Sequence, residues 1–490
     1  MVDFLHGAEV QEVDSGARTI STVKMSVIGI VVVAENSAAA TSASLTLGST
    51  ALADDLNFTA VKPGRDGNAI NITIVKATEE SQTTSVSVTG QAITITLGND
   101  SETSGNAFRV CAVVNASAEA SALVTCTTTS TEEETEILDT TTKVFLENGT
   151  DEPFPLDTPV LVYGDEKYAE PLGTDTDAYK YIAQLMEQYG ALVVVVRAKY
   201  SSDADEQKSN IINAIEMFKI AKAKIEVKPR ILIAPGYSHD DAVGAKLESV
   251  SFKLRAISYL DMAMTASKTS AMQRTKLYGE RVEVQWPWHK IWDTDLNQYI
   301  HMPSSVSAVG LRCRIDSEFG VHYSKSNNEY YNLSGTYEDV QWELSDKSSV
   351  ANVLNSNKVS TTILASGFLH WGNRTCSNDS KWVFETSRRT IDMVNDSVES
   401  SMMWAVDRPG TTQWLQDVLE SINNYLRGLK TQGVIVDGKA WLAEDVNTPD
   451  LMSQGVYYFD FDVGLYYPGE HLIFRSKVNN GYLEEVLNNV

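Results

Sequence analysis

The chain has 490 residues, of which 43% are hydrophobic and 21% charged, and its formal net charge is −25. This length exceeds what one hydrophobic core supports and predicts two to four domains of ordinary globular composition. The acidic balance argues against binding to nucleic acid or to anionic lipid, because both require basic patches.

The N-terminus lacks the cationic segment of a secretory signal, and the apolar run 27–34 is far shorter than the ~20 residues that span a bilayer. The four cysteines, Cys111, Cys126, Cys313 and Cys376, form no CxxC pair. This usage favours a reducing compartment with free, mostly buried thiols. A disulfide between Cys111 and Cys126 stays open as an alternative. We expect the protein to be made and kept in the cytoplasm until assembly.

Residues 1–24 are interpreted as an extended N-terminal arm. Polar and apolar residues alternate there with the period of a strand, and residues 14–16 carry a turn signal. Val10, Val13 and Ile20 would give this arm one apolar edge. The continuous apolar run that follows is typical of a strand buried on both faces of an α/β sheet.

Residues 38–135 have a different composition. Segments rich in Ala, Ser and Thr flank short alternating runs that are separated by Thr-Gly and Gly-Asn turns. This pattern predicts an inserted all-β, sandwich-like outer domain. Residues 108–123 are the segment that fits a short helix.

Residues 25–37 and 136–375 alternate between strand and helix patterns, which predicts an α/β domain with a largely parallel sheet. Helices are expected over 176–189, 205–223 and 304–315. A further helix is expected to begin after Ser238, which would be its cap.

Residues 376–481 predict a C-terminal α+β core domain. Amphipathic helices are expected over 388–404, with one buried apolar stripe, and over 411–429. A strand around 456–461, a Pro-Gly turn and a second strand around 472–474 should follow. The C-terminal arm, 482–490, stays apolar to its end, where a free terminus is usually polar and frayed. We therefore interpret both ends as strands that another subunit holds, in a multidomain α/β (α+β) fold.

No constellation in the sequence predicts chemistry, because it contains no GxSxG elbow, no HExxH pair and no Rossmann fingerprint. Residues 64–67 lack the Gly-Lys-Ser/Thr of a phosphate loop and are interpreted as a hairpin turn. Asp460 and Asp462 would share one strand face, where an ion pair or solvent is favoured over a metal ion. The aromatic cluster 286–292 fits packing better than sugar stacking. We expect no catalytic residue, no cofactor and no metal.

Three separated motifs resemble the tail sheath proteins of contractile-tailed bacteriophages. The first is residues 6–31, His-Gly-Ala-Glu-Val-Gln-Glu-Val-Asp-Ser-Gly followed by Val-Ile-Gly-Ile-Val. The second is Gly-Phe-Leu-His-Trp-Gly-Asn-Arg-Thr-Cys at 367–376, with Arg-Arg and Asp-Ser downstream. The third runs from Tyr-Phe-Asp-Phe-Asp-Val-Gly at 458–464 to the end. The resemblance covers about residues 1–35 and 136–490, and the inserted segment departs from it.

The resemblance implies a structural subunit that assembles helically around a tail tube and contracts to drive the tube through the host envelope. It implies hexameric rings linked by exchange of terminal strands, with tube, baseplate and tail terminator proteins as partners and the virion tail as location. It also implies no nucleic acid partner and no membrane contact by the subunit. The expected subunit-interface residues are Val10, Val13, Ile20, Phe461, Phe474, Leu483, Val486 and Leu487. Arg427 and Lys430 are the expected tube-facing residues.

Two alternatives remain open at this stage. One is a carbohydrate-binding or surface-binding virion or adhesin module that grips its target with the inserted domain. The other is an α/β hydrolase acting on carbohydrate near the aromatic cluster.

Overall fold

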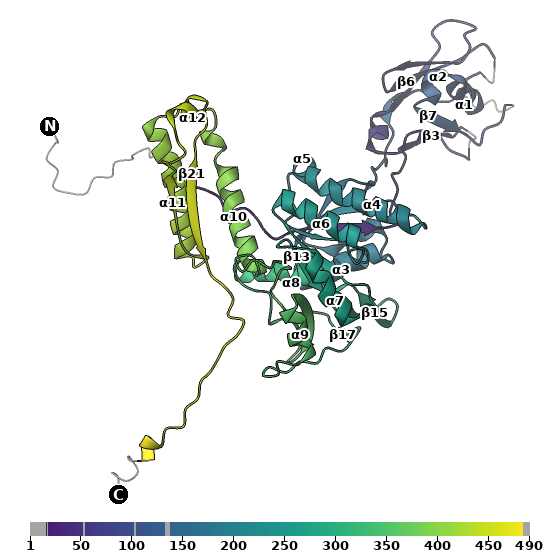
Figure 1. Cartoon of the computed structure of the whole chain (residues 1–490). Coiled ribbons are helices and arrows are strands. Elements are labelled where there is room, and N and C mark those ends of the chain that lie inside the picture. The colour runs from purple at the N-terminus through teal and green to yellow at the C-terminus, as the bar shows by residue number, and fades with distance from the viewer. Residues whose placement is uncertain (1–15, 17, 52–53, 102–103, 133–137, 484–490) are drawn as a thin grey trace, which may run out of the picture. The chain divides into compact units, whose positions relative to one another are not determined.

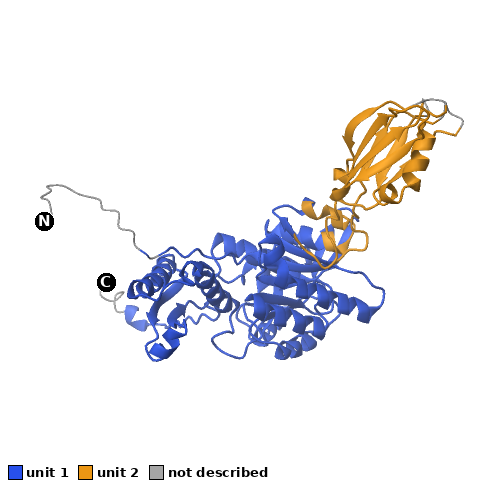
Figure 2. Ribbon diagram, turned by 90° about the horizontal axis from the view of Figure 1, so that it is seen from above, with its two compact units in different colours: residues 1–32, 161–167, 180–490 blue, residues 33–160, 168–179 orange. Residues whose placement is uncertain are grey.

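The computed structural model describes residues 16, 18–51, 54–101, 104–132 and 138–483. The chain forms two compact units (Figure 2). The first comprises residues 1–32, 161–167 and 180–490, and the second comprises residues 33–160 and 168–179. The described residues of each unit include a hydrophobic cluster of its own.

The first unit is built on a nine-stranded sheet in the order β16-β19-β18-β13-β12-β11-β1-β10-β9. Its strands are β1 (Val27–Val33), β9 (Pro159–Tyr163), β10 (Leu192–Ala198), β11 (Ile231–Ile233), β12 (Ile257–Asp261), β13 (Val282–Gln285), β16 (Asn328–Glu329), β18 (Val359–Leu364) and β19 (Phe368–Trp371). The neighbours from β1 through β11, β12 and β13 to β18 pair in parallel, while β19 and β16 add antiparallel at one edge. The expectation of a largely parallel sheet is confirmed for these central strands.

The apolar sequence of β1 suits a strand in the middle of such a sheet, where both faces are covered. Six of its seven residues are buried. Gly29 is required by close packing, because a Cβ there would lie 2.8 Å from Leu232 Cδ2.

The described residues of this α/β part form seven α-helices: α3 (Asp177–Gln188), α4 (Ala204–Glu216), α5 (Ala221–Ile225), α6 (Asp241–Leu254), α7 (Lys268–Arg274), α8 (Ser304–Glu318) and α9 (Val350–Ser356). The helices expected over 176–189 and 304–315 are confirmed as α3 and α8. The one expected over 205–223 is divided into α4, a 3-10 turn and α5. The expected cap of α6 was wrong: Asp240 accepts from the N–H of Ala242 at 2.8 Å, whereas the Ser238 hydroxyl accepts from the N–H of Asp261 at 2.9 Å.

A small antiparallel sheet accompanies this part, in the order β15-β14-β17. Its strands are β14 (His289–Asp293), β15 (Gln298–Met302) and β17 (Gly335–Thr336). Its strand β14 includes the second half of the aromatic cluster 286–292.

The C-terminal part of the first unit contains α10 (Glu385–Ser401), α11 (Thr412–Thr431), α12 (Pro449–Ser453), β20 (Ile435–Leu442) and β21 (Phe459–Leu465) (Figure 1). Thr411 caps α11, its hydroxyl accepting a hydrogen bond from the N–H of Trp414. Buried residues of α10, α11 and β20 form one apolar cluster, which Phe459, Phe461 and Val463 of β21 flank.

The expectation of a single buried stripe on α10 was incomplete, because its charged residues are buried as well. Asp392 pairs with Arg281, whose Nη2 lies 3.0 Å from Oδ1, and Asp396 pairs with Arg230. Glu385 accepts a hydrogen bond from the ammonium of Lys325 at 2.6 Å. Helix α10 therefore contacts the α/β part through buried ion pairs and the C-terminal cluster through apolar side chains.

The second unit contains a three-stranded sheet, β2-β3-β7, and a four-stranded sheet, β5-β6-β4-β8. Its strands and helices are β2 (Ser44–Leu47), β3 (Leu56–Ala60), β4 (Asn71–Lys76), β5 (Ser85–Thr89), β6 (Ala92–Leu97), α1 (Ala107–Ala116), α2 (Ala118–Ser121), β7 (Val124–Thr127) and β8 (Thr141–Phe145). Both sheets and α1 contribute to one apolar cluster, so the expectation of an all-β domain is corrected to α+β.

Two further expectations for this segment were wrong. The boundary expected at residue 135 falls too early, because β8 pairs with β4 and Leu146 belongs to the same cluster. Residues 65–69 form a 3-10 helix that connects β3 to β4. Since these strands lie in different sheets, the segment is a crossing between sheets rather than a hairpin turn.

Cys111 of α1 and Cys126 of β7 form a disulfide, with their Cα atoms 5.1 Å apart. The expectation of free thiols is thus corrected for this pair and confirmed for Cys313 and Cys376, which are free and buried. Sequence spacing alone could not decide the pairing, because it depends on α1 packing against β7.

We expect reduction of this disulfide to destabilise the second unit by about 3 kcal/mol, because the bond closes a 15-residue loop in the unfolded chain. Hydrogen exchange of amides in α1 and β7 should become faster in dithiothreitol. The Cys111→Ala/Cys126→Ala variant provides the control, because its exchange should not respond to the reductant. Equal exchange of the wild-type chain with and without reductant would contradict this expectation.

Candidate assembly interface

The strands β20 and β21 form a two-stranded antiparallel sheet, in which Lys439 opposes Asp462 and Ala440 opposes Phe461. Side chains of β21 alternate between half-buried and exposed positions, which is why its sequence alternates aromatic or aliphatic residues with aspartate and glycine. Asp460 and Asp462 accordingly share one exposed face, as expected. A two-stranded sheet is marginal by itself and depends here on its packing against α11.

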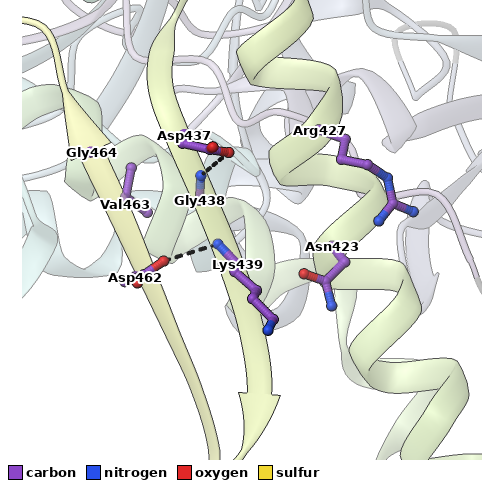
Figure 3. A pocket seen from close by; sticks show the side chains of 8 residues that line it. All are labelled: Asn423, Arg427, Asp437, Gly438, Lys439, Asp462, Val463 and Gly464. Atoms are coloured by element: carbon purple, nitrogen blue, oxygen red, sulfur yellow. Dashed lines mark hydrogen bonds between the residues drawn. The ribbon is translucent and has the colours of Figure 1, made fainter.

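The outer edge of β20 is covered by a side chain of α11. The amide of Asn423 accepts a hydrogen bond from the N–H of Ala440 at 2.9 Å and donates one to its carbonyl at 3.1 Å. The main chain of Ala440 therefore faces α11, and its pair with Phe461 is of the non-hydrogen-bonded type. Figure 3 shows Asn423 on α11, beside β20 and on the side away from β21.

The outer edge of β21 is open. Because pair types alternate along an antiparallel ladder, the N–H and C=O groups of Phe461 and Val463 point away from β20. Among the residues that the structure describes, no strand pairs with β21 on that side. A free edge of this kind is a template for pairing with another chain.

The segment after β21 does not form the second strand expected around 472–474. A bond from the Glu470 N–H to the Pro468 carbonyl makes the expected turn. Beyond it the chain is extended and exposed: the exposed fractions are 69% for Leu472, 90% for Phe474 and 97% for Val478. A strand needs a partner, and none of the described residues supplies one here.

Of the three interface residues expected on the C-terminal arm, the structure describes one. Leu483 is 62% exposed, close to a short 3-10 turn at Asn480–Tyr482. Val486 and Leu487 lie outside the described residues.

The described end of the N-terminal arm packs on its own chain. Ile20 is 6% exposed within the C-terminal cluster, and the N–H of Arg18 donates to the hydroxyl of Ser421 at 2.8 Å. The expectation that Ile20 forms an intersubunit contact is corrected, because its side chain fills the core beside α10 and α11. Val10 and Val13 lie outside the described residues.

Arg427 and Lys430 lie on the exposed side of α11. Arg427 pairs with Glu420 at 2.6 Å and Lys430 with Asp437 at 2.7 Å. A surface depression adjoins them, lined by Asn423, Arg427, Asp437, Gly438, Lys439, Asp462, Val463 and Gly464 (Figure 3). Both cations remain more than half exposed and accessible to a partner.

The aromatic cluster is mainly a packing feature. Trp286 is 2% exposed, and its Nε1–H donates to the carbonyl of Ala266 at 2.7 Å. The Nε1–H of Trp288 donates to the carbonyl of Met262 at the same distance. Only Trp292 of the three is well exposed, at 39%, where it contacts Tyr299 edge to face. Satisfied indole groups of this kind favour packing over sugar stacking.

No group of three or more His, Cys, Asp or Glu residues could hold a metal ion within the described ranges. The described helices also include none that is long and apolar enough to cross a membrane.

The fold matches that of contractile sheath subunits. The structure is similar to the helical sheath of the anti-feeding prophage in its contracted state, with a TM-score of 0.56, 13% identity and coverage of 98% of this chain and 100% of that one. It also resembles the contracted sheath of the PVC extracellular contractile injection system, with a TM-score of 0.53, 15% identity and coverage of 68% and 89%.

Sequence comparison identifies the family. Residues 377–479 match the phage tail sheath C-terminal domain. The tail sheath protein of Escherichia phage P2 is 32% identical over 356 residues, which cover 69% of this chain and 89% of the relative. The putative prophage major tail sheath protein of Pseudomonas aeruginosa UCBPP-PA14 is 30% identical over 338 residues, covering 67% and 88%. The chain belongs to the phage tail sheath protein family.

Proposed function

We propose that this protein is the structural subunit of a contractile tail sheath, which assembles helically around a tail tube and contracts to drive the tube through the host envelope. One observation carries the proposal beyond family membership: a sheet with a single open edge lies in the same chain as an extended, exposed apolar tail. Among the described residues, neither feature has a partner strand, which another copy could supply. The family is one of structural proteins, and the proposed work derives from contacts between subunits rather than from a cofactor.

We further propose that arms of neighbouring subunits add to the edge of β21. Main-chain hydrogen bonds would then link the subunits, and side chains would set the register. The contacts near the C-terminus are Phe474 of the extended segment and Leu483, Val486 and Leu487 of the C-terminal arm, and the receiving strand carries Phe461. On the N-terminal arm they are Val10 and Val13.

The other proposed partners are the proteins that a sheath would contact in a tail. The exposed cations Arg427 and Lys430 of α11 are proposed to face the tail tube. The chain would form hexameric rings that contact baseplate and tail terminator proteins, and assembly would take place in the host cytoplasm. Structures of the anti-feeding prophage baseplate contain chains with this fold, at 14–15% identity.

Replacing Val463 with proline tests the open edge. Its N–H points away from β20, so proline would remove a donor for an added strand while the bonds between β20 and β21 remain. We expect the protein concentration needed for tube formation to rise about tenfold, which corresponds to roughly one lost hydrogen bond per subunit.

The control for this variant is Val463→Ala, which removes the two methyl groups of the valine side chain but keeps the N–H. Sedimentation and negative-stain microscopy would measure assembly, and circular dichroism would verify the monomer. Equal assembly of the proline and alanine variants would exclude β21 as the receiving edge.

A further inference from the structure

The C-terminal tail is the segment that follows β21, described over residues 466–483. Near its start it is bound to the body, the rest of the first unit, by Arg374. Arg374 Nε donates to Glu470 Oε1 at 2.8 Å, and Arg374 Nη2 donates to Glu470 Oε2. This is the two-pronged geometry in which a guanidinium binds a carboxylate most specifically. The hydrogen bond that Arg374 donates to Glu470 is the main reason that the pKa of the Arg374 guanidinium is raised.

The body presents Arg374 from a rigid position. Its main chain forms an antiparallel bridge with Phe384, and the flanking bonds join Thr375 N–H to the Val383 carbonyl at 2.8 Å and Glu385 N–H to the Asn373 carbonyl at 3.0 Å. The ring of Phe384 lies 5.7 Å from the guanidinium and 6.2 Å from the ring of Tyr467 on the tail. Two tail residues thus contact the same rigid site of the body: Glu470 contacts Arg374, and Tyr467 contacts Phe384.

The described part of the tail is bound at Glu470 and exposed beyond it. The side chain of Glu470 is 31% exposed, and the residues Leu472 and Ile473 as a whole are 69% and 71% exposed. The Arg374 side chain is 33% exposed, and a partly exposed ion pair is weak enough to open under load or in high salt.

We propose that Arg374 and Glu470 form a clasp that sets the reach of the C-terminal arm toward a second copy of this chain. With the clasp closed, the described segment 471–483 can extend about 45 Å from the body. Opening it frees residues 466–470 and adds about 17 Å of chain. The closed clasp therefore keeps residues 466–470 in reserve. When a neighbouring copy moves away, this segment can extend while the exchanged strand stays paired. The role in the assembly rests on the proposed function, whereas the closing of the clasp is a property of the single chain.

Spin labels at Ser380→Cys on the body and Val478→Cys on the tail would measure the clasp in the monomer by double electron–electron resonance. Glu470→Gln keeps the size of the side chain and removes its charge. We expect the mean label distance to increase and its distribution to widen in this variant, and in the wild-type background at 1 M salt. The charge swap Arg374→Glu/Glu470→Arg should restore the short, narrow distribution.

Arg109→Gln provides a matched control, because it breaks an exposed ion pair with Glu132 in the second unit and should leave the distribution unchanged. Identical distributions for the wild-type and Glu470→Gln chains would overturn the clasp. Because the label distances are measured in monomers, they can contradict the clasp even when the protein still forms tubes. A wild-type chain that shows the short, narrow distribution but forms no tubes would instead contradict the proposed function.

Discussion

A chain that ends at Glu470 is expected to remain a folded monomer and to form no tubes. The removed residues include Leu472, Ile473 and Phe474, which are 69%, 71% and 90% exposed and therefore contribute little to the core of their own chain. The thermal midpoint of the monomer should shift by no more than 1–2 °C, the effect of a few tenths of a kcal/mol. Microscopy and sedimentation would record assembly, and calorimetry the midpoint.

Substitutions within the full-length tail give the matched comparison. Replacing Leu472, Ile473 and Phe474 with serine should also prevent assembly, whereas replacing Arg475, Lys477 and Asn479 with serine should preserve it. At the other end, only residues 1–15 should be removed, because a longer deletion would take Ile20 out of the core. Normal tubes from the chain that ends at Glu470 would disprove the role of the tail.

Lys325→Met is expected to destabilise the first unit by about 3–5 kcal/mol. The ammonium of Lys325 lies 2.6 Å from a carboxylate oxygen of Glu283 and 2.6 Å from one of Glu385, and all three side chains are at most 1% exposed. The substitution would leave two buried carboxylates without this cation, the condition under which breaking a buried pair costs most. Urea unfolding monitored by tryptophan fluorescence would measure the loss.

The effect of this variant should depend on pH. Burial is the largest influence and by itself raises the pKa of Glu283 and Glu385. The charge of Lys325, together with His370 beside Glu283 and with Arg312 and Arg389 beside Glu385, outweighs burial, so the pKa of both carboxyls lies below the usual 4.5. Carboxyls with a lowered pKa stabilise the fold at neutral pH, and this contribution disappears as the pH falls below about 4.5. The difference in the free energy of unfolding between wild type and Lys325→Met should therefore become smaller as the pH is lowered.

Lys430→Met removes a lysine from an exposed ion pair and should change stability by less than about 0.5 kcal/mol. A loss as small for Lys325→Met as for this control would show that the buried cluster does not hold α10 in place.

The sequence predicted those elements whose pattern depends only on local periodicity. The apolar run of β1, buried on both faces, and the amphipathic α11, with one buried face, occur where expected. The strand expected around 456–461 occurs a few residues later, as β21 at Phe459–Leu465, with the expected alternation. The run at Leu472–Phe474 has a similar pattern but remains extended, because a strand also needs a partner and periodicity does not supply one.

Features that depend on long-range packing could not be predicted in this way. In the sequence, Asn423 is one of several polar residues of a helix. Its two hydrogen bonds to the main chain of Ala440 in β20 depend on how the helix packs against the strand. Lys325 lies in a polar stretch without periodicity, yet it is fully buried between carboxylates from β13 and α10. Arg374 lies in a motif that resembles the sheath family, but no pattern in the sequence pairs it with Glu470.

The most direct test of the account is the density along the outer edge of β21 in assembled tubes, measured by electron cryo-microscopy of the full chain. The account predicts at least one added strand there, continuous with the terminal arm of a different copy, while Asn423 still covers the edge of β20. A sheet that remains two-stranded in the tube, with both ends of every chain folded onto their own subunit, would contradict it.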